Sequence, residues 1–210
     1  MSENSEFIKH YPPSSPFRAW AYEKWLSLGI TRFLKTRRVR FMDQLLDGAI
    51  SKASTIMEVG CGSGRDFVKL MQPAPAHIYG LDLFDAGLRQ PNFTFVQGDV
   101  ANIPFEDGYF DVTVSMGVLE HIEPMEKLAA GIREIARVSR RFCIGVPCIA
   151  TRFEPHFWEY RWQLKRPNTR QLNVNYLSDQ AWTSFQGFAG TKTCRFDYIP
   201  GLITTLMIYK

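Results

Sequence analysis

Long apolar runs and paired cysteines are both missing from this sequence. No apolar stretch approaches the roughly 18 residues that a membrane-spanning helix needs. The four cysteines, Cys61, Cys143, Cys148 and Cys194, include no C-x-x-C pair. We therefore expect small buried thiols in a reducing compartment rather than zinc ligands or a disulfide framework.

A strong excess of one charge, internal repeats and low-complexity segments are also missing. The 210 residues carry a net charge of +4, and 45% of them are hydrophobic. These values are typical of one soluble globular domain with a full core. The first residues, MSENSEFIKHYPP, are polar and contain no secretory signal. The sequence therefore predicts a cytoplasmic protein with a single domain over residues 1–210 and no transmembrane segment.

Positive charge is nevertheless concentrated in two segments. Residues 31–41, TRFLKTRRVRF, hold five basic residues and no acid. Residues 151–170 hold five basic and two acidic residues, together with several aromatic side chains. Two interpretations stay open: a solvated helix face with an ordinary packed insertion, or contact with an anionic substrate, a membrane surface or RNA.

A short apolar run followed by three alternating glycines is the most informative pattern. Residues 55–66 read TIMEVGCGSGRD, and the glycines are Gly60, Gly62 and Gly64. This pattern is typical of a buried strand that breaks into a tight turn against a ligand before a helix. Glycine reaches backbone angles that other residues avoid, and it lacks the Cβ that would keep a ligand away from the main chain.

Ligand-binding residue types recur at the ends of the following strand-like segments. HIYGLDL places Asp82 at 22 positions after Gly60. Open α/β sheets carry an acid about 20 residues after the glycine turn, where it accepts hydrogen bonds from ribose hydroxyls. FTFVQGD then places Asp99, and YFDVTVS runs into MGVLEHI. Because such sheets bind ligands at the carboxyl ends of their strands, these segments predict one binding edge.

Alternating strand and helix patterns predict the remaining elements, and strands that alternate with helices form a parallel sheet covered on both faces. The expected strands are Thr55–Gly60, His77–Leu83, Phe93–Gln97, Tyr109–Ser115, Arg141–Val146, Thr191–Ile199 and Leu202–Tyr209. The expected helices are Phe17–Ile50 with a break at Gly29, Arg65–Met71, Pro124–Val138 and Ser178–Phe188. Residues 1–50 would form an N-terminal helical cap, and residues 148–176 would form an insertion.

These segments together resemble the class I S-adenosylmethionine (SAM)-dependent methyltransferases, in particular the group that modifies small molecules, lipids and sugars. The matching segments are EVGCGSG at 58–64, LDL at 81–83, QGDVANIPFEDGYFDVTVS at 97–115 and GVLEHI at 117–122. The resemblance implies an α/β fold with a Rossmann-like, seven-stranded, mostly parallel sheet, helices on both faces and an antiparallel last strand. It also implies SAM as cofactor, and an enzyme that methylates a small-molecule or lipid- or sugar-linked acceptor. A nicotinamide-dependent dehydrogenase is disfavoured, because its fingerprint is G-x-G-x-x-G whereas here Arg65 follows G-x-G-x-G.

The resemblance also implies roles for individual residues. Asp82 would accept hydrogen bonds from both ribose hydroxyls, Asp99 would accept one from the adenine amino group, and Glu58 would reach the cofactor's amino end. Bracing of the loop by Glu58, turn or capping roles for the two aspartates, and core packing by Met116 and Val118 stay open. The expected cofactor-binding residues are Glu58, Gly60, Cys61, Gly62, Gly64, Asp82, Leu83, Asp99, Val100, Met116 and Val118.

His121 is the candidate catalytic residue. Imidazole titrates near neutral pH and is able to take a proton from a hydroxyl or amine. The LEH tripeptide resembles that of quinone-type O-methyltransferases, in which an acid four positions before the histidine helps to bind a divalent cation. That position is Gly117 here, so we expect no metal. A structural role for His121, as a cofactor-wall or capping residue, stays open.

Two other functions stay open beside a small-molecule methyltransferase: an RNA methyltransferase and a non-catalytic SAM-binding scaffold. Nucleic acid is disfavoured, because the sequence shows no recognisable RNA-binding module and no N-P-P-Y-type tetrapeptide. The insertion holds Trp158 and Trp162 one helical turn apart, with Arg161 and Lys165 at the same interval. We expect either a helical lid over an acceptor with an apolar part and a negative group, or plain packing of the insertion on the sheet.

Overall fold

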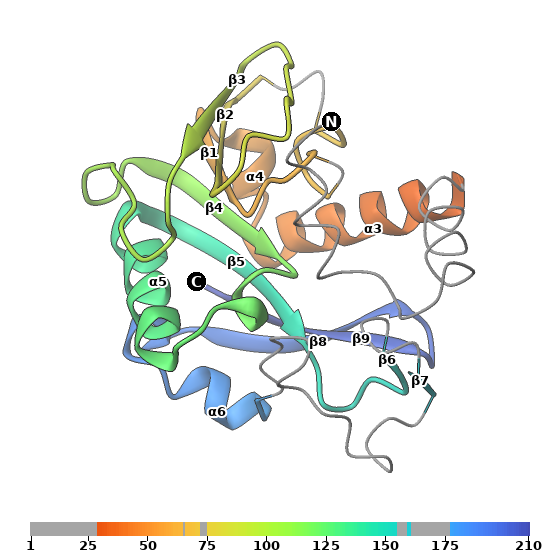
Figure 1. The fold of residues 1–210 in the computed structure, drawn as a ribbon. Helices are drawn as coiled ribbons and strands as arrows, with labels where there is room; N and C mark the ends of the chain where they lie inside the picture. The colour runs from red at the N-terminus through yellow and green to blue at the C-terminus, as the bar shows by residue number, and fades with distance from the viewer. Residues whose placement is uncertain (1–28, 65, 72–74, 155–158, 161–176) are drawn as a thin grey trace, which may run out of the picture.

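The computed structural model describes residues 29–64, 66–71, 75–154, 159–160 and 177–210. Its main sheet contains seven strands in the order β3-β2-β1-β4-β5-β9-β8, and Figure 1 shows this sheet with α3 and α5 beside it. The strands are β1 (Thr55–Val59), β2 (His77–Asp82), β3 (Phe93–Gln97), β4 (Phe110–Met116), β5 (Ser139–Pro147), β8 (Lys192–Ile199) and β9 (Ile203–Tyr209).

The direction of the strands confirms the predicted fold class. β1 pairs in parallel with β2 and β4, β3 pairs in parallel with β2, and β5 pairs in parallel with β4. β9, the last strand along the chain, runs antiparallel to both β5 and β8. The sheet is therefore mostly parallel with an antiparallel last strand, as a Rossmann-like methyltransferase fold requires.

The apolar composition of the central strands explains their position in the sheet. Four of the five residues of β1 are buried, and five of the seven residues of β4 are buried. Parallel strands covered on both faces have such near-continuous apolar sequences. β3 lies at the edge of the sheet, and each of its residues is at least partly exposed.

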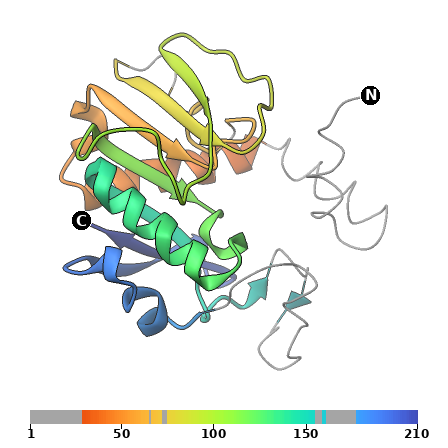
Figure 2. The same cartoon turned by 60° about the vertical axis from the view of Figure 1, so that its left-hand side comes forward.

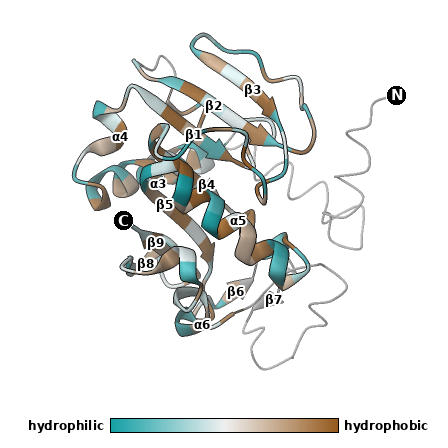
Figure 3. Ribbon diagram, turned by 90° about the vertical axis from the view of Figure 1, so that its left-hand side faces the viewer, coloured by the Kyte–Doolittle hydropathy of each residue, from teal (hydrophilic) through white to brown (hydrophobic). Residues whose placement is uncertain are grey.

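Helices cover both faces of the sheet, and each face has its own hydrophobic core. On one face, α5 (Met125–Val138) buries Leu128, Ile132 and Ile135, whose spacing places them on one side of the helix. Figure 2 shows α5 in front of the sheet. Figure 3 shows hydrophobic residues along β4 and β5, and both hydrophobic and hydrophilic residues along α5. The other face packs against α3 (Gly29–Leu45) and α4 (Ala49–Lys52).

Three of the predicted helices differ from the structure. The described part of the expected helix Phe17–Ile50 is interrupted by a turn at residues 46–48, between α3 and α4. The described residues 66–71 of the expected helix Arg65–Met71 form turns, closed by the Lys69 amide to the Gly64 carbonyl at 2.9 Å. The expected helix Ser178–Phe188 is wrong as one element: it is split into α6 (Asp179–Thr183) and the 3-10 helix η4 (Gln186–Phe188). Phe185 between them is extended, and Gly187 lies so close to the α5 backbone that a Cβ would be 2.8 Å from the Ile132 carbonyl oxygen. Packing against α5 therefore overrides the local helical pattern.

The described start of the expected insertion lies against the β8–β9 turn. The Thr151 hydroxyl donates a hydrogen bond to the Leu202 carbonyl at 3.2 Å and accepts one from the Thr204 amide at 3.1 Å. Two short strands follow, β6 (Phe153–Glu154) and β7 (Glu159–Tyr160). The residues on which the expected lid depends, Trp158, Arg161, Trp162 and Lys165, lie outside the described residues, as do residues 1–28 of the expected cap. Over the described ranges, the helices are too short or too polar to cross a bilayer.

Candidate functional site

The carboxyl ends of β1, β2 and β3 meet at one edge of the sheet. The amides of Gly60 and Cys61, just after β1, both donate to the Leu81 carbonyl of β2, at 2.7 and 3.3 Å. The Gly98 amide, just after β3, donates to the Asp82 carbonyl at 3.0 Å. These bonds hold the glycine loop beside the acids that follow the neighbouring strands.

The three glycines of this loop have left-handed backbone conformations for different reasons. Their φ angles are +72° at Gly60, +45° at Gly62 and +70° at Gly64. A Cβ at Gly60 would lie 2.2 Å from Val118, and one at Gly64 would lie 2.5 Å from Leu88. Among the described residues, no atom would lie within 4 Å of a Cβ at Gly62. Packing therefore requires the first and third glycines, whereas none of the described residues fills the space beside the main chain at Gly62, so a ligand is able to approach it there.

Asp82 is anchored beside that open backbone. Its Oδ2 accepts the Gly62 amide at 2.9 Å, and its Oδ1 accepts the Phe84 amide at 3.3 Å. A carboxylate has about four lone-pair sites, so each oxygen retains acceptor capacity for a hydroxyl pair. Leu83 and Phe84, which follow directly, are 50% and 60% exposed and add an apolar surface next to the carboxylate.

Asp99 is tied to α5 and to its own turn. Its Oδ2 lies 2.6 Å from the Lys127 ammonium, and its Oδ1 accepts the Ala101 amide at 3.0 Å. Burial raises the pKa of Asp99, but Lys127 and the Ala101 amide lower it more, so the net shift is downward. Val100 is buried against Gly131 of α5, which leaves its main chain rather than its side chain for a ligand.

Glu58 is a buried carboxyl within β1, with 3% of its surface exposed. Its Oε2 accepts the Val68 amide at 3.2 Å, which ties β1 to the turns that follow the glycine loop. Burial and the negative charge of Asp66 raise the pKa of Glu58 well above its ordinary value. Glu58 therefore braces the loop, and its carboxylate form is costly in this environment.

The raised pKa predicts that Glu58→Gln stabilises the free protein at alkaline pH. A carboxyl whose pKa is raised by folding contributes stability at low pH and loses it as the pH rises through the folded-state pKa. Glutamine keeps an oxygen for the Val68 amide and carries no charge. We expect a higher melting temperature than the wild type at pH 8 and a smaller difference at pH 5, measured by calorimetry without ligand. A lower melting temperature for the variant at pH 8 would contradict this explanation.

Much of the basic segment 31–41 binds the protein itself. Lys35 and Arg38 both pair with Asp66, at 3.1 and 2.8 Å. The Arg37 guanidinium lies over the Phe196 ring at 4.8 Å and donates to the Tyr198 carbonyl at 3.0 Å. These contacts favour the interpretation of this segment as a packed helix face for these three side chains, whereas Arg32 and Arg40 are exposed.

The segment after β4 closes the same edge. Val118 covers Gly60, and Met116 packs against Gly145 of β5, where a Cβ would lie 2.5 Å from the Met116 sulfur. His121 is half-buried on the 3-10 helix η1 (Leu119–His121), and its amide donates to the Val118 carbonyl at 3.0 Å. The contact with Gly145 supports core packing for Met116, whereas Val118 and His121 belong to the segment beside the glycine loop.

Cys61 offers this edge only its main chain. Its side chain is buried, with the sulfur 2.7 Å from the position of a Cβ on Gly80. Burial, followed by the charges of Glu58 and Asp82, raises the pKa of the thiol. The thiol is therefore protonated at neutral pH.

Several residues that shape this edge were missed by the sequence interpretation. Lys35, Arg38 and Asp66 connect α3 to the glycine loop, and Lys127 on α5 pairs with Asp99. The available signal was the polar side of the amphipathic α5 helix, but periodicity does not reveal which distant residues that side contacts.

This chain has an open sheet with a glycine loop and with two acids at the ends of adjacent strands. These features are typical of the class I SAM-dependent methyltransferases. A family model described as a methyltransferase domain matches residues 57–142 of the chain, and this match supports the same class.

Known methyltransferases are similar to this chain in sequence. An uncharacterized methyltransferase of Synechocystis is 29% identical over 141 residues, which are 61% of this chain and 66% of that protein. Phthiotriol/phenolphthiotriol dimycocerosates methyltransferase 1 of Mycobacterium ulcerans is 29% identical over 136 residues, 59% of this chain and 49% of that protein. The first three relatives are matched over 66%, 44% and 56% of their length, so the chain spans less than two thirds of each.

Solved structures agree on the fold. A 1,6-didemethyltoxoflavin-N1-methyltransferase of Burkholderia thailandensis has a TM-score of 0.60 at 15% identity, with 98% of this chain and 84% of that chain covered. A magnesium protoporphyrin IX methyltransferase of Synechocystis has a TM-score of 0.60 at 18% identity, with 83% and 81% covered. Both were crystallised with S-adenosylhomocysteine (SAH), and at this identity each shows the fold alone.

Proposed function

We propose that this chain binds SAM at the edge formed by the glycine loop, Asp82 and Asp99, and transfers its methyl group to a small-molecule or lipid-linked acceptor. The observation that carries the proposal is the anchored Asp82 carboxylate between open backbone at Gly62 and the exposed side chains of Leu83 and Phe84. This arrangement combines acceptors for a diol with an apolar surface for an aromatic ring.

The residues of this edge fit the parts of SAM. Asp82 would hold the ribose hydroxyls, and Asp99 with the Val100 main chain would hold the adenine ring. The backbone at Gly62 would lie beside the methionyl portion, and Glu58 would act behind it at the amino end. The family resemblance supports each of these roles, and the fit rests on acceptor groups and open space at that edge.

When bound, SAM supplies an electrophilic methyl group whose leaving group is a neutral thioether, so no acid is needed to expel it. The protein's contribution is then to hold the reacting atoms about 3–3.5 Å apart, in line and away from water. Val118 lies against the loop at Gly60, and in this proposal an acceptor would approach beside Val118 and the segment to His121. The His121 imidazole would receive a proton from a hydroxyl or amine acceptor.

A small-molecule or lipid-linked acceptor has more support than RNA. The names of similar proteins specify acceptors such as phthiotriol dimycocerosates and 2-phytyl-1,4-naphtoquinone. The basic segment 31–41 was the main argument for RNA. Three of its side chains, Lys35, Arg37 and Arg38, bind partners within the chain instead.

Binding of SAM and SAH is expected to stabilise the fold. A ligand that binds only the native state adds about 2.7 kcal/mol at 100 times its dissociation constant. Differential scanning calorimetry with SAM, SAH and, as a control, NADH measures this shift. We expect both SAM and SAH to raise the melting temperature and NADH to leave it unchanged. No shift with SAM or SAH would overturn the cofactor proposal.

The acceptor class is tested by incubating the protein with methyl-labelled SAM and fractionated cell extract. We expect label in the small-molecule or lipid fraction. Label in RNA would support the RNA methyltransferase instead, and tight SAM binding with no transfer to any fraction would support a scaffold.

A further inference from the structure

The loop between β3 and β4 has no regular secondary structure and is held along its length by one side of α5. Residues 98–109 contain neither helix nor strand. Four residues of α5, spaced by four, three and three positions, contact this loop: Lys127, Gly131, Glu134 and Arg137. We refer to these four residues as the α5 contact row. Such spacing places them on one side of a helix.

The contact row follows the loop in chain order. Lys127 binds the Asp99 carboxylate at 2.6 Å. The absence of a side chain at Gly131 admits Val100, because a Cβ there would lie 3.0 Å from a Val100 methyl. The Glu134 carboxylate accepts the Ile103 amide at 2.9 Å. Each successive part of the loop therefore depends on a residue further along α5.

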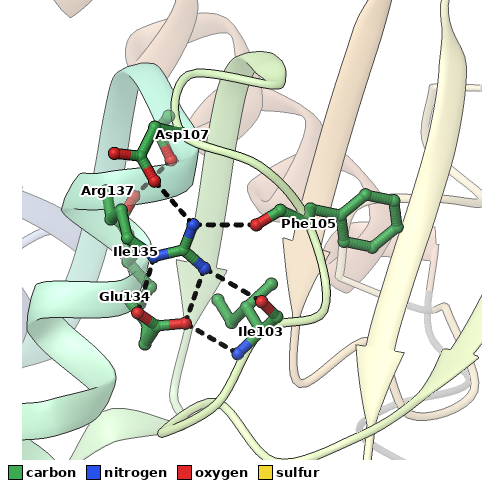
Figure 4. A network of polar contacts seen from close by, with 7 residues as sticks. Ile103, Phe105, Asp107, Glu134, Ile135 and Arg137 are labelled. Carbon is green, nitrogen blue, oxygen red and sulfur yellow. Dashed lines mark hydrogen bonds and ion pairs between the residues drawn. The ribbon is translucent and has the colours of Figure 1, made fainter.

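Arg137 makes the largest number of these contacts, as Figure 4 shows. Its Nη1 donates to the Phe105 carbonyl and to the Asp107 carboxylate, both at 2.8 Å. Its Nη2 donates to the Ile103 carbonyl at 3.0 Å and to Glu134 Oε2 at 2.8 Å. Hydrogen bonds that involve a charged partner are the stronger ones, and the planar guanidinium serves several acceptors at once.

Glu134 and Arg137 also fix each other. The Arg137 Nε donates to Glu134 Oε1 at 2.7 Å, so the pair is bidentate. Hydrogen bonds from Arg137 lower the pKa of Glu134 below its ordinary value against the opposing effect of burial. The carboxylate thus stays charged at neutral pH and remains an acceptor for the Ile103 amide.

We propose that Glu134 and Arg137 are positioning residues for the adenine-binding part of the loop. By fixing the main chain at Ile103 and Phe105 and the side chain of Asp107, they determine where Asp99 and Val100 lie at the edge of the sheet. This inference rests on the proposed function, because Asp99 and Val100 matter only where SAM binds. The loop is also tied to β2, because the Gly98 amide donates to the Asp82 carbonyl at 3.0 Å and the Phe105 ring lies 5.4 Å from the Tyr79 ring.

The test compares two ligands by titration calorimetry: SAH, and S-inosylhomocysteine, which carries an oxo group in place of the adenine amino group. Arg137→Ala is expected to weaken SAH binding at least about tenfold, since charge-assisted hydrogen bonds that order the loop are lost. The loss for S-inosylhomocysteine should be smaller, because Asp99 has no amino group to accept from. The preference for SAH should therefore shrink. Arg133→Ala is the matched control, since this arginine is exposed on the same helix.

A milder variant keeps the test decisive if Arg137→Ala does not fold. Arg137→Lys retains the charge but cannot serve the four partner residues of Arg137 with one planar group. We expect an intermediate preference for SAH and faster hydrogen exchange at the Ala101, Asn102 and Ile103 amides. A purely structural role would lower the melting temperature and leave the ligand preference and these exchange rates unchanged. That outcome would overturn the inference, whereas failure of the wild type to bind SAH would overturn the proposed function itself.

Discussion

Asp82→Ala is expected to weaken SAH binding by about 1.5–3 kcal/mol, or roughly 10- to 150-fold, as judged from the strength of hydrogen bonds to charged groups. Alanine removes both acceptors proposed for the ribose hydroxyls. It also removes the bond from the Gly62 amide that holds the glycine loop in place. Both losses weaken SAH binding, whereas only the loss of the Gly62 bond acts on the folded protein without ligand. We therefore expect a larger change in the free energy of binding than in the free energy of unfolding.

Two further variants separate these contributions in the same calorimetric titration. Asp82→Asn keeps one side-chain oxygen, so we expect a smaller loss of affinity than with alanine. Asp85→Ala removes a nearby exposed acid that pairs with Arg89 at 2.9 Å and serves as the control. If Asp82→Ala binds SAH as tightly as the wild type, this carboxylate does not hold the ribose.

Gly60→Ala is expected to destabilise the protein as well as impair binding. The left-handed conformation alone costs a non-glycine residue about 1–3 kcal/mol. The added methyl carbon would also lie 2.2 Å from Val118, so that side chain must move. For a chain of this size each kcal/mol lowers the melting temperature by about 2–4 °C. Chemical denaturation and SAH titration measure the two effects.

The comparison with Gly62→Ala distinguishes strain from steric conflict. Gly62 has a left-handed backbone too, but its Cβ would lie more than 4 Å from every atom in the part of the chain that the structure describes. We expect this variant to lose less stability than Gly60→Ala and to lose SAH affinity, because the methyl group enters the space proposed for the cofactor. Adding Val118→Ala to Gly60→Ala should restore part of the stability. If the double variant is no more stable than Gly60→Ala, the contact with Val118 is not the cause.

The fold followed closely from the sequence because its strongest signals are local. The strand patterns predicted all seven strands of the sheet, with ends that differ by at most two residues, and the buried central strands β1 and β4 have near-continuous apolar sequences. The glycine loop and Asp82 were recognisable because their spacing is set by one strand, one turn and the next strand. Such signals depend on residues that are near one another along the chain.

The predictions failed or fell short where distant residues decide the structure. The expected helix after the glycine loop forms turns, and the expected helix at 178–188 is broken where Gly187 meets α5. The pairing of Arg38 with Asp66 joins residues 28 positions apart, and no local pattern reveals it. The contact row on α5 reads as an ordinary polar helix face, since its partners belong to a loop without periodicity.

The position of β9 has a consequence for the order in which the protein is assembled. This strand follows every other strand of the sheet in the sequence, yet it lies between β5 and β8. During synthesis the five parallel strands are able to associate as they emerge, because each finds its neighbour among segments already made. β8 borders no strand of the sheet other than β9, so it must wait until the ribosome has released residues 203–209. The last two strands therefore join the nascent domain as one hairpin.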